Sequence, residues 1–194
     1  MPVNDSQAHS DNARALLVNA ELIYDATAVQ AAVDKVARQL NQRFDHAGGA
    51  PFPLVLGVMG GAVVFSGQLL TRLSFPLEFD YIHVTRYGNK DRGGTIEWKV
   101  EPRPDVRGRT VVVLDDILDE GETLAHIKQR LLAMGAAEVL LAVFADKDIG
   151  KTKPVTPDYV GLVLPNKFVV GYGMDAYGYW RNLPDIRAIK TGHG

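Results

Sequence analysis

The segment VVVLDDILDEGETL, residues 111–124, decides the fold of this sequence. Its first four residues are apolar, which predicts a strand buried on both faces of a sheet. Leu124, Ile127 and Leu131 then recur at helical spacing, so a helix is expected to follow. The acidic loop between the strand and the helix would lie at the carboxyl end of the strand, where open parallel sheets bind their ligands.

The chemistry of this loop suits a sugar phosphate. Adjacent carboxylates at Asp115 and Asp116, with Asp119 close behind, suit ribose hydroxyls or a hydrated Mg²⁺ that a polyphosphate carries. The next residues would form a helix N-terminus, where free backbone N–H groups and the helix dipole favour a phosphate. These residues are Glu120, Gly121, Glu122 and Thr123. The alternative is a solvated acidic turn that caps the helix, and two adjacent acids directly after an apolar strand make it the weaker interpretation.

The same order of strand, loop and helix occurs a second time. Residues 54–59 predict a buried strand, and Gly60 and Gly61 lead into a helix over residues 63–73. Paired glycines allow a ligand to approach the backbone, although a tight turn alone would also explain them. The other expected elements are strands at residues 16–18, 77–84, 95–100 and 139–144, and a helix from a capping box at Thr27 and Gln30 to Phe44.

Two connections between strands bear on the site. Residues 111–144 form a strand, a helix and a strand, for which a right-handed parallel crossover is the expected geometry. That crossover places Lys147 at the same sheet edge as Asp115 and Asp119. The polar loop of residues 86–94 is either an exposed hairpin with surface cations or a lid over an anionic ligand.

Length and composition indicate one globular domain. The chain has 194 residues, of which 46% are hydrophobic and 23% are charged. We expect residues 13–194 to form that domain and the polar residues 1–12 to be a disordered tail. The net charge of -2 favours neither nucleic acid nor an anionic membrane as a partner. The sequence shows no signal peptide, membrane-spanning run or cysteine, so a cytoplasmic location is expected.

The acidic loop resembles the phosphoribosyl-pyrophosphate (PRPP) motif of the type I phosphoribosyltransferases. Asp119 resembles the aspartate of their 6-oxopurine branch, the hypoxanthine-guanine phosphoribosyltransferases, and the resemblance extends from about Leu54 almost to the C-terminus. It implies an α/β fold with a mostly parallel twisted sheet, flanking helices and a small hood built from the N- and C-terminal parts. It also implies purine salvage, in which a homodimer or homotetramer transfers a phosphoribosyl group from PRPP to hypoxanthine or guanine with the help of Mg²⁺.

The resemblance implies a role for each matching residue. Asp119 is the expected catalytic residue, either as general base or as a carboxylate that stabilises positive charge. The residues expected to bind the ribose and 5′-phosphate of PRPP are Asp115, Asp116, Glu120, Gly121, Glu122 and Thr123. Those expected to bind pyrophosphate are Met59, Gly60 and Arg181, and those expected to bind the purine are Lys147, Phe168, Val169 and Asp175. The expected Mg²⁺ ligands are Asp115, Asp116 and Asp175, and the expected mobile loop includes Arg86 and Tyr87.

Three positions depart from the pattern of the resembled family. Met59 stands where a Lys or Arg is usual, so a pyrophosphate contact there would need backbone N–H groups. Arg86 stands where a Ser is common, and Glu120 where a small or hydroxyl residue helps to bind phosphate. Because carboxylates repel a nearby phosphate, we expect the side chains of Glu120 and Glu122 to turn outward.

Alternatives remain for the function and for one residue. A PRPP- or nucleotide-sensing regulator on the same fold would keep the PRPP loop but bind RNA or DNA, and the lack of a basic excess argues against it. An unrelated sugar-phosphate-binding α/β protein would use only the acidic loop, which leaves the segment around Phe168 unexplained. Phe168 would be an ordinary core residue if its flanking motif meant nothing. The resemblance implies instead that its ring stacks on the purine, a suitable partner for an aromatic side chain.

Overall fold

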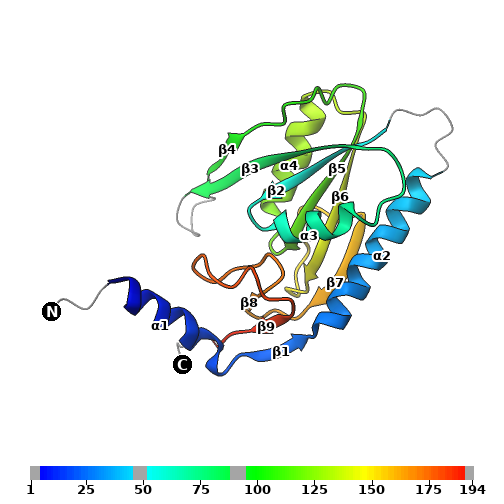
Figure 1. Ribbon diagram of the computed structural model, residues 1–194. Coiled ribbons are helices and arrows are strands. Elements are labelled where there is room, and N and C mark those ends of the chain that lie inside the picture. The colour runs from blue at the N-terminus through cyan, green and yellow to red at the C-terminus, as the bar shows by residue number, and fades with distance from the viewer. Residues whose placement is uncertain (1–4, 46–51, 88–94, 191–194) are drawn as a thin grey trace.

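The computed structural model describes residues 5–45, 52–87 and 95–190, which form a six-stranded sheet, a three-stranded sheet and four helices (Figure 1). The strands of the large sheet are β2 (Leu54–Met59), β3 (Glu78–Tyr87), β4 (Thr95–Val100), β5 (Thr110–Leu118), β6 (Glu138–Lys147) and β7 (Tyr159–Leu164). Their spatial order is β4-β3-β2-β5-β6-β7, and all neighbours are parallel except β3 and β4. The predicted mostly parallel α/β sheet is confirmed.

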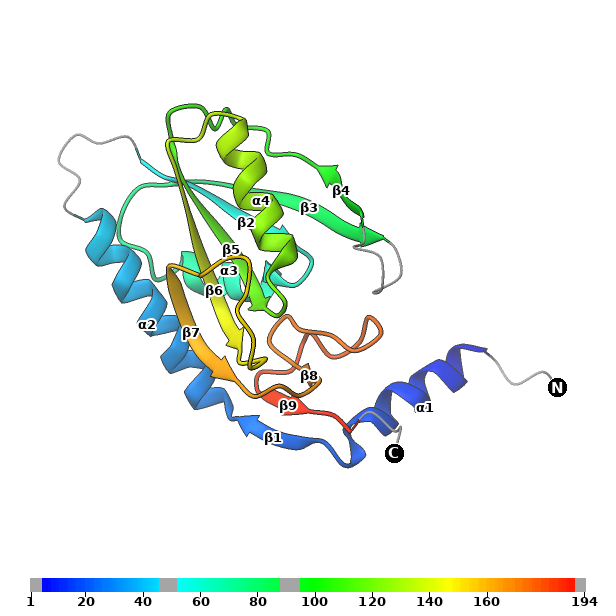
Figure 2. The same ribbon diagram turned by 180° about the vertical axis from the view of Figure 1, so that it is seen from behind.

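Helices cover both faces of this sheet. They are α2 (Ala26–Phe44), α3 (Ala62–Leu70) and α4 (Glu122–Ala133). Figures 1 and 2 show α2 and α3 on one face and α4 on the other. Val112 and Leu114 of β5 pack in the core with α2 and α3, whereas Val111 and Val113 pack with α4. This alternation follows from the two-residue period of a strand, and it confirms that the strand is buried on both faces.

A small antiparallel sheet lies beyond the carboxyl ends of β5 and β6 (Figure 2). It consists of β1 (Glu21–Tyr24), β9 (Ile186–Ala188) and β8 (Val169–Val170), in that order. The Tyr24 hydroxyl donates a hydrogen bond of 3.0 Å to the carbonyl oxygen of Val163 in β7, which ties the small sheet to the large one. The predicted hood, built from the N- and C-terminal parts, is confirmed.

The N-terminal residues form a helix where a tail and a short strand were predicted. Helix α1 spans Asp5–Val18. The strand predicted at residues 16–18 is therefore wrong, and residues 5–12 of the predicted tail are helical. The carbonyl oxygen of Ala13 accepts a hydrogen bond of 2.8 Å from the indole of Trp180. Local periodicity does not reveal such a contact with the far end of the chain.

Two helix ends also differ from prediction. The N-cap of α2 is Asp25, whose carboxylate accepts a hydrogen bond of 2.8 Å from the backbone N–H of Ala28. The predicted capping box at Thr27 is wrong, because Asp25 already satisfies a free N–H group of the first turn. Helix α3 ends at Leu70, three residues before the predicted end.

In the described part of the chain, no helix is long and apolar enough to cross a bilayer.

The strands around the acidic loop are longer than predicted. β5 continues through Leu118, because its ladder with β6 pairs Asp115 with Val143 and Leu118 with Asp146. Ladder hydrogen bonds join backbone groups, so the ladder does not end where the apolar run ends. β3 reaches Tyr87, and so includes the first two residues of the predicted loop, while residues 88–94 lie outside the described residues. The strands β1, β7, β8 and β9 were not predicted individually.

Candidate active site

The acid pair of β5 lies where three segments of the chain meet. The residues Asp115 and Asp116 are only 9% and 8% exposed, and the Asp115 carboxylate accepts a hydrogen bond of 3.0 Å from the backbone N–H of Asp116. A Cβ atom at Gly61, before α3, would collide with the Asp116 carboxylate. A Cβ atom at Gly173, in the segment after β8, would collide with the carbonyl oxygen of Gly61. Two glycines thus leave room for the Asp116 side chain.

Burial opposes the ionisation of this pair. It raises the pKa of Asp115 well above its ordinary value, and the nearby charge of Asp116 raises that pKa further. Burial also raises the pKa of Asp116, although a side-chain hydrogen bond with Asp115 and the positive charge of Arg181 act in the opposite direction. Hydrogen-bond donors or a cation would stabilise the ionised form of two carboxylates in such surroundings.

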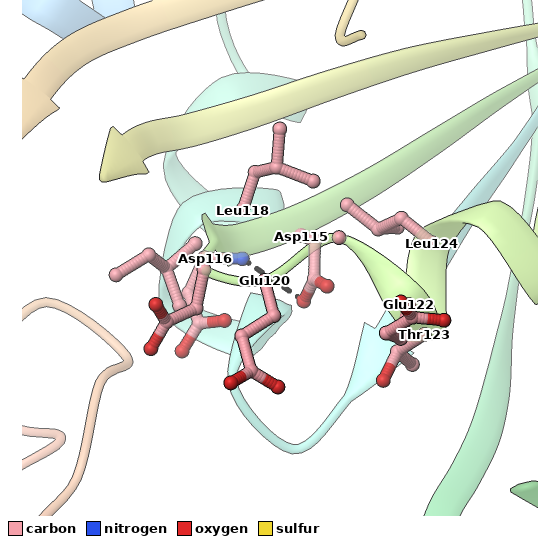
Figure 3. Close-up of a pocket in the computed structure, with 10 residues that line it drawn as sticks. Asp115, Asp116, Leu118, Glu120, Glu122, Thr123 and Leu124 are labelled. Carbon is pink, nitrogen blue, oxygen red and sulfur yellow. Dashed lines mark hydrogen bonds between the residues drawn. The ribbon is translucent and has the colours of Figure 1, made fainter. Parts of the chain in front are cut away.

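The loop after β5 leads into the N-terminus of α4, which has the features of an anion site. Gly121, the N-cap of α4, is buried and has a φ of 86°, a left-handed conformation that glycine adopts without strain. The free N–H groups of the first turn of α4 are suited to a phosphate. Residues 115–124 line a cavity of about 400 Å³ (Figure 3). Glu120 and Glu122 are exposed at its rim, and Figure 3 shows Glu122 beside Thr123 at the helix start.

Asp119 and Lys147 meet at the carboxyl edge of the sheet. The Lys147 ammonium donates a hydrogen bond of 2.6 Å to the Asp119 carboxylate. Lys147 is 7% exposed, whereas Asp119 is exposed. The parallel ladder between β5 and β6 brings the two residues together, which confirms the placement expected from the crossover.

A second cavity, of about 330 Å³, unites most of the predicted site. It is lined by Val58, Met59, Gly60, Gly61, Asp115, Asp116, Ile117, Asp119, Lys147, Phe168, Val169, Met174, Asp175 and Arg181. Phe168 is 38% exposed and therefore not a core residue, whereas its neighbour Val169 is buried. The Phe168 ring lies at this cavity, as base stacking requires.

Arg181 contacts two carboxylates that line this cavity, one from β5 and one from the segment after β8. Its guanidinium lies 2.5 Å from the Asp175 carboxylate and 3.9 Å from that of Asp116, and it donates a hydrogen bond of 2.5 Å to the carbonyl oxygen of Gly173. Asp175 also accepts a hydrogen bond of 2.7 Å from the backbone N–H of Gly178. The segment after β8 thus holds a cation and a carboxylate close to Asp116.

The remaining predicted residues lie at the ends of β2 and β3. Met59 and Gly60 line the second cavity and are joined by a cis peptide bond. The Met59 side chain is half-buried and carries no charge, so backbone groups are the polar groups offered there. Arg86 and Tyr87 end β3, and the structure describes only their backbone.

The carboxylates suit Mg²⁺ together with the oxygens of a ligand. Asp115, Asp116 and Asp175 present hard oxygen donors around one cavity, and oxygen atoms are the ligands that Mg²⁺ prefers. Among the described residues, no three carboxylate or imidazole groups lie close enough together to hold a metal by themselves. Protein sites for Mg²⁺ commonly use one or two carboxylates plus substrate phosphates and water, so the donor set fits an ion that arrives with a polyphosphate.

The sequence did not single out two residues that shape this site. Gly173 carries no local signal of its own, because its contact with Gly61 depends on folding. Lys153 lies in the connection between β6 and β7 and hydrogen-bonds the backbone on both sides of the Asp119–Lys147 pair. No local pattern marks it, since a lysine in a polar loop is normally solvated.

Comparisons with known proteins agree with this geometry. Residues 19–176 match the model of the phosphoribosyl transferase domain family. A hypoxanthine-guanine phosphoribosyltransferase of Streptococcus pneumoniae is 34% identical over 160 residues, which are 82% of this chain and 87% of that protein. The bifunctional protein TilS/HprT of Listeria monocytogenes is 35% identical over 94% of this chain, and the chain spans 26% of its length. The structure of a hypoxanthine phosphoribosyltransferase from Staphylococcus aureus has a TM-score of 0.80 at 25% identity, over 97% of both chains.

Proposed function

We propose a 6-oxopurine substrate for this chain, which belongs to the phosphoribosyl transferase family. The proposed reaction joins a ring nitrogen of hypoxanthine or guanine to the anomeric carbon of PRPP and expels pyrophosphate, which gives IMP or GMP. Relatives named hypoxanthine-guanine phosphoribosyltransferase, at 34% and 31% identity over more than four fifths of this chain, support this choice of base. The reaction would serve purine salvage.

The observation that carries the proposal is the Asp119–Lys147 pair beside Phe168. The Lys147 ammonium is a donor without an acceptor function, so it suits the exocyclic oxygen of an oxopurine and has no comparable partner in the amino group of adenine. The Asp119 carboxylate, 2.6 Å from that ammonium, would take the proton of the ring nitrogen or stabilise positive charge on the base. The exposed Phe168 ring would stack on the heterocycle, above the buried Val169.

The other end of the site would bind PRPP. Asp115 and Asp116 would accept hydrogen bonds from the ribose hydroxyls, and the backbone N–H groups of residues 121–123, with the Thr123 hydroxyl, would hold the 5′-phosphate. Arg181 and the backbone at Met59 and Gly60 would bind the pyrophosphate. Mg²⁺, held by the pyrophosphate and by carboxylates of Asp115, Asp116 and Asp175, would offset the charge of the leaving group.

Three further features stay predictions. Arg86 and Tyr87, at the end of β3, would begin a loop that closes over the bound substrates. A homodimer or homotetramer and a cytoplasmic location would match the resembled family. Exclusion of water from the closed site would protect PRPP from hydrolysis.

Pyrophosphate release from PRPP and Mg²⁺ tests the proposal, with hypoxanthine, guanine, xanthine or adenine supplied separately. We expect turnover of oxopurines but not of adenine, and a loss of about 10²- to 10⁴-fold in Asp119→Asn, the usual contribution of a positioned acid or base. Asp45→Asn, at the exposed end of α2, is the matched control and should keep full activity. PRPP binding without turnover of any base would overturn the transferase and favour a regulator.

A further inference from the structure

The ammonium group of Lys153 has three hydrogen-bond partners within the protein. Its side chain is only 11% exposed. The ammonium donates to the Asp146 carboxylate at 2.5 Å, to the Lys147 carbonyl oxygen at 2.6 Å and to the Leu118 carbonyl oxygen at 2.8 Å. An ammonium has three donors, so all of them are used within the protein. The group is therefore a cross-link between backbone segments.

The partners of Lys153 lie where the strand ladder ends. Leu118 and Asp146 are the last residues of β5 and β6 that the parallel ladder pairs with each other. Asp119 and Lys147 follow them directly. The Lys153 ammonium thus joins the two strands just beyond the end of their ladder. Asp119 and Lys147 lie at this point of the two strands.

We propose that Lys153 is a positioning residue for the base-binding pair. Its ammonium fixes the backbone of Lys147 and the peptide before Asp119, so that both side chains reach one purine at the same time. The inference rests on the proposed function, and it adds a determinant that lies behind the cavity: Lys153 is not among the residues that line the cavity holding Asp119, Lys147 and Phe168.

The stem and the ammonium of Lys153 contribute in different ways. The Cβ atom of Lys153 and the Cδ atom of Pro154 lie 3.4 Å and 3.3 Å from the position that a Cβ atom of Gly121 would occupy. The stem therefore packs beneath the acidic loop. Lys153→Met keeps most of this apolar stem and removes the three hydrogen bonds, which leaves two carbonyl oxygens and one carboxylate without their cation.

Loss of the three hydrogen bonds of Lys153 should impair the reaction of the base and leave the binding of PRPP nearly unchanged. A displacement of about 1 Å in a catalytic group lowers rates by about 100-fold, so kcat/KM for hypoxanthine should fall about 10- to 100-fold in Lys153→Met. Asp115 and Asp116 are held by the β5 ladder and by the glycines that enclose Asp116. The KM for PRPP should therefore change less than about threefold. A residue needed only for folding would lower the amount of active enzyme and leave both KM values unchanged.

The experiment compares Lys153→Met with Lys151→Met, an exposed lysine of the same loop, and with Lys153→Arg, which keeps a cation. Steady-state constants for hypoxanthine and PRPP are measured, together with hydrogen exchange of the Asp119 and Asp148 amides in the substrate-free protein, because the carbonyl oxygens of these two peptides accept hydrogen bonds from Lys153. We expect the base-selective loss and faster exchange in Lys153→Met, wild-type behaviour in Lys151→Met and partial rescue in Lys153→Arg. Unchanged exchange and an unchanged KM for hypoxanthine in folded Lys153→Met would overturn the proposal, as would parallel changes in both KM values.

A second, milder variant tests the proposal if Lys153→Met does not fold. Asp146→Asn keeps the ammonium and both carbonyl partners but removes the carboxylate charge, so it should shift the same constants in the same direction by a smaller factor. No shift in that variant would overturn the proposal. Faster exchange in Lys153→Met, combined with no turnover of any base by the wild type, would contradict the proposed function and leave the positioning role of Lys153 in place.

Discussion

At the scale of single residues, the proposed role of Asp115 and Asp116 in ligand binding conflicts with their contribution to stability. Both carboxylates are buried, and burial raises the pKa of each. The proposed contacts with ribose hydroxyls and Mg²⁺ both require the ionised form. The substrate-free protein thus keeps a pair of groups whose charge disfavours folding, as functional sites often do.

Asp115→Asn should stabilise the substrate-free protein at neutral pH. Because the folded-state pKa of Asp115 is raised above its ordinary value of 3.8, its protonated form favours folding at low pH. That contribution is lost as the pH rises through the raised pKa. The thermal midpoint of the variant should exceed the wild type at pH 7 by roughly 2–4 °C, the shift for about 1 kcal/mol in a domain of this size.

The pH dependence supplies the control for this prediction. At a pH near the ordinary value of 3.8, the wild-type carboxyl is protonated in the folded protein, and the two midpoints should converge. A midpoint difference that is absent at pH 7, or equal at both pH values, would show that burial of the Asp115 charge does not limit stability.

Phe168→Leu should weaken base binding selectively. Stacking of a base on an aromatic ring is worth roughly 1–3 kcal/mol, so the KM for hypoxanthine should rise about 10-fold while the KM for PRPP stays unchanged. Phe79→Leu is the matched control, since Phe79 is also 38% exposed but lies in β3 and outside the cavity. Equal effects of the two substitutions on the KM for hypoxanthine would rule out stacking on Phe168.

Individual site residues were predictable where they follow one another in a motif. Asp115, Asp116 and Asp119 follow the apolar run of residues 111–114 closely, and that position alone suggests a ligand. The roles proposed for Phe168 and Arg181 came only from the resemblance. Tertiary contacts such as those of Lys153 with two backbone carbonyl oxygens leave no local pattern in a sequence.

Elements were predictable where an apolar pattern defines them. The strand at Leu54–Met59 and the strand at Thr95–Val100 have the predicted bounds. β5 was predicted too short, because its last residues include two aspartates that continue the backbone ladder. The two-residue β8 and the three-residue β9 are too short for a periodic signal.

The start of α3 should tolerate no side chain at Gly61. Its φ of -64° is ordinary, so the cost of a substitution is the collision of a Cβ atom with the Asp116 carboxylate. Gly61→Ala should raise the KM for PRPP at least about 10-fold, because it displaces a carboxylate that would grip the ribose. The assay is the dependence of pyrophosphate release on PRPP concentration.

Gly67→Ala is the control for this element. Gly67 lies within α3, and a Cβ atom there meets nothing within 4 Å. The substitution should therefore leave the KM for PRPP unchanged and stabilise the helix by about 0.5–1 kcal/mol. A Gly61→Ala enzyme with a normal KM for PRPP would show that the Asp116 carboxylate is free to move aside.

At the scale of the whole molecule, the N- and C-terminal parts of the chain meet in the hood. β9, near the C-terminus, lies between β1 and β8, and Trp180 contacts α1 through Ala13. The parallel pairing of β5 with β6 follows from their crossover, but the insertion of β2 between β3 and β5 does not follow from any local pattern. The order of the large sheet therefore had to come from the structure or from the resemblance.

Two N-terminal deletions should distinguish the contribution of α1 to stability from that of β1 in the hood. Removal of residues 1–18 takes away α1 and leaves β1, so the protein should fold with a thermal midpoint only a few degrees lower. Removal of residues 1–24 also deletes β1, which pairs with β9 and carries Tyr24, and should abolish cooperative unfolding. Similar midpoints for the two deletions would mean that β1 is not needed to hold the hood.

A competition assay tests the central claim most directly. Equal concentrations of hypoxanthine and adenine are supplied with PRPP and Mg²⁺ in one reaction, and the ratio of the two nucleotide products gives the ratio of their kcat/KM values. Because a site that hydrogen-bonds a substrate group strongly rejects an analogue without it, the account predicts at least about a 10³-fold preference for hypoxanthine. Comparable amounts of both products would contradict selection by Lys147, and no product from either base would contradict the transferase itself.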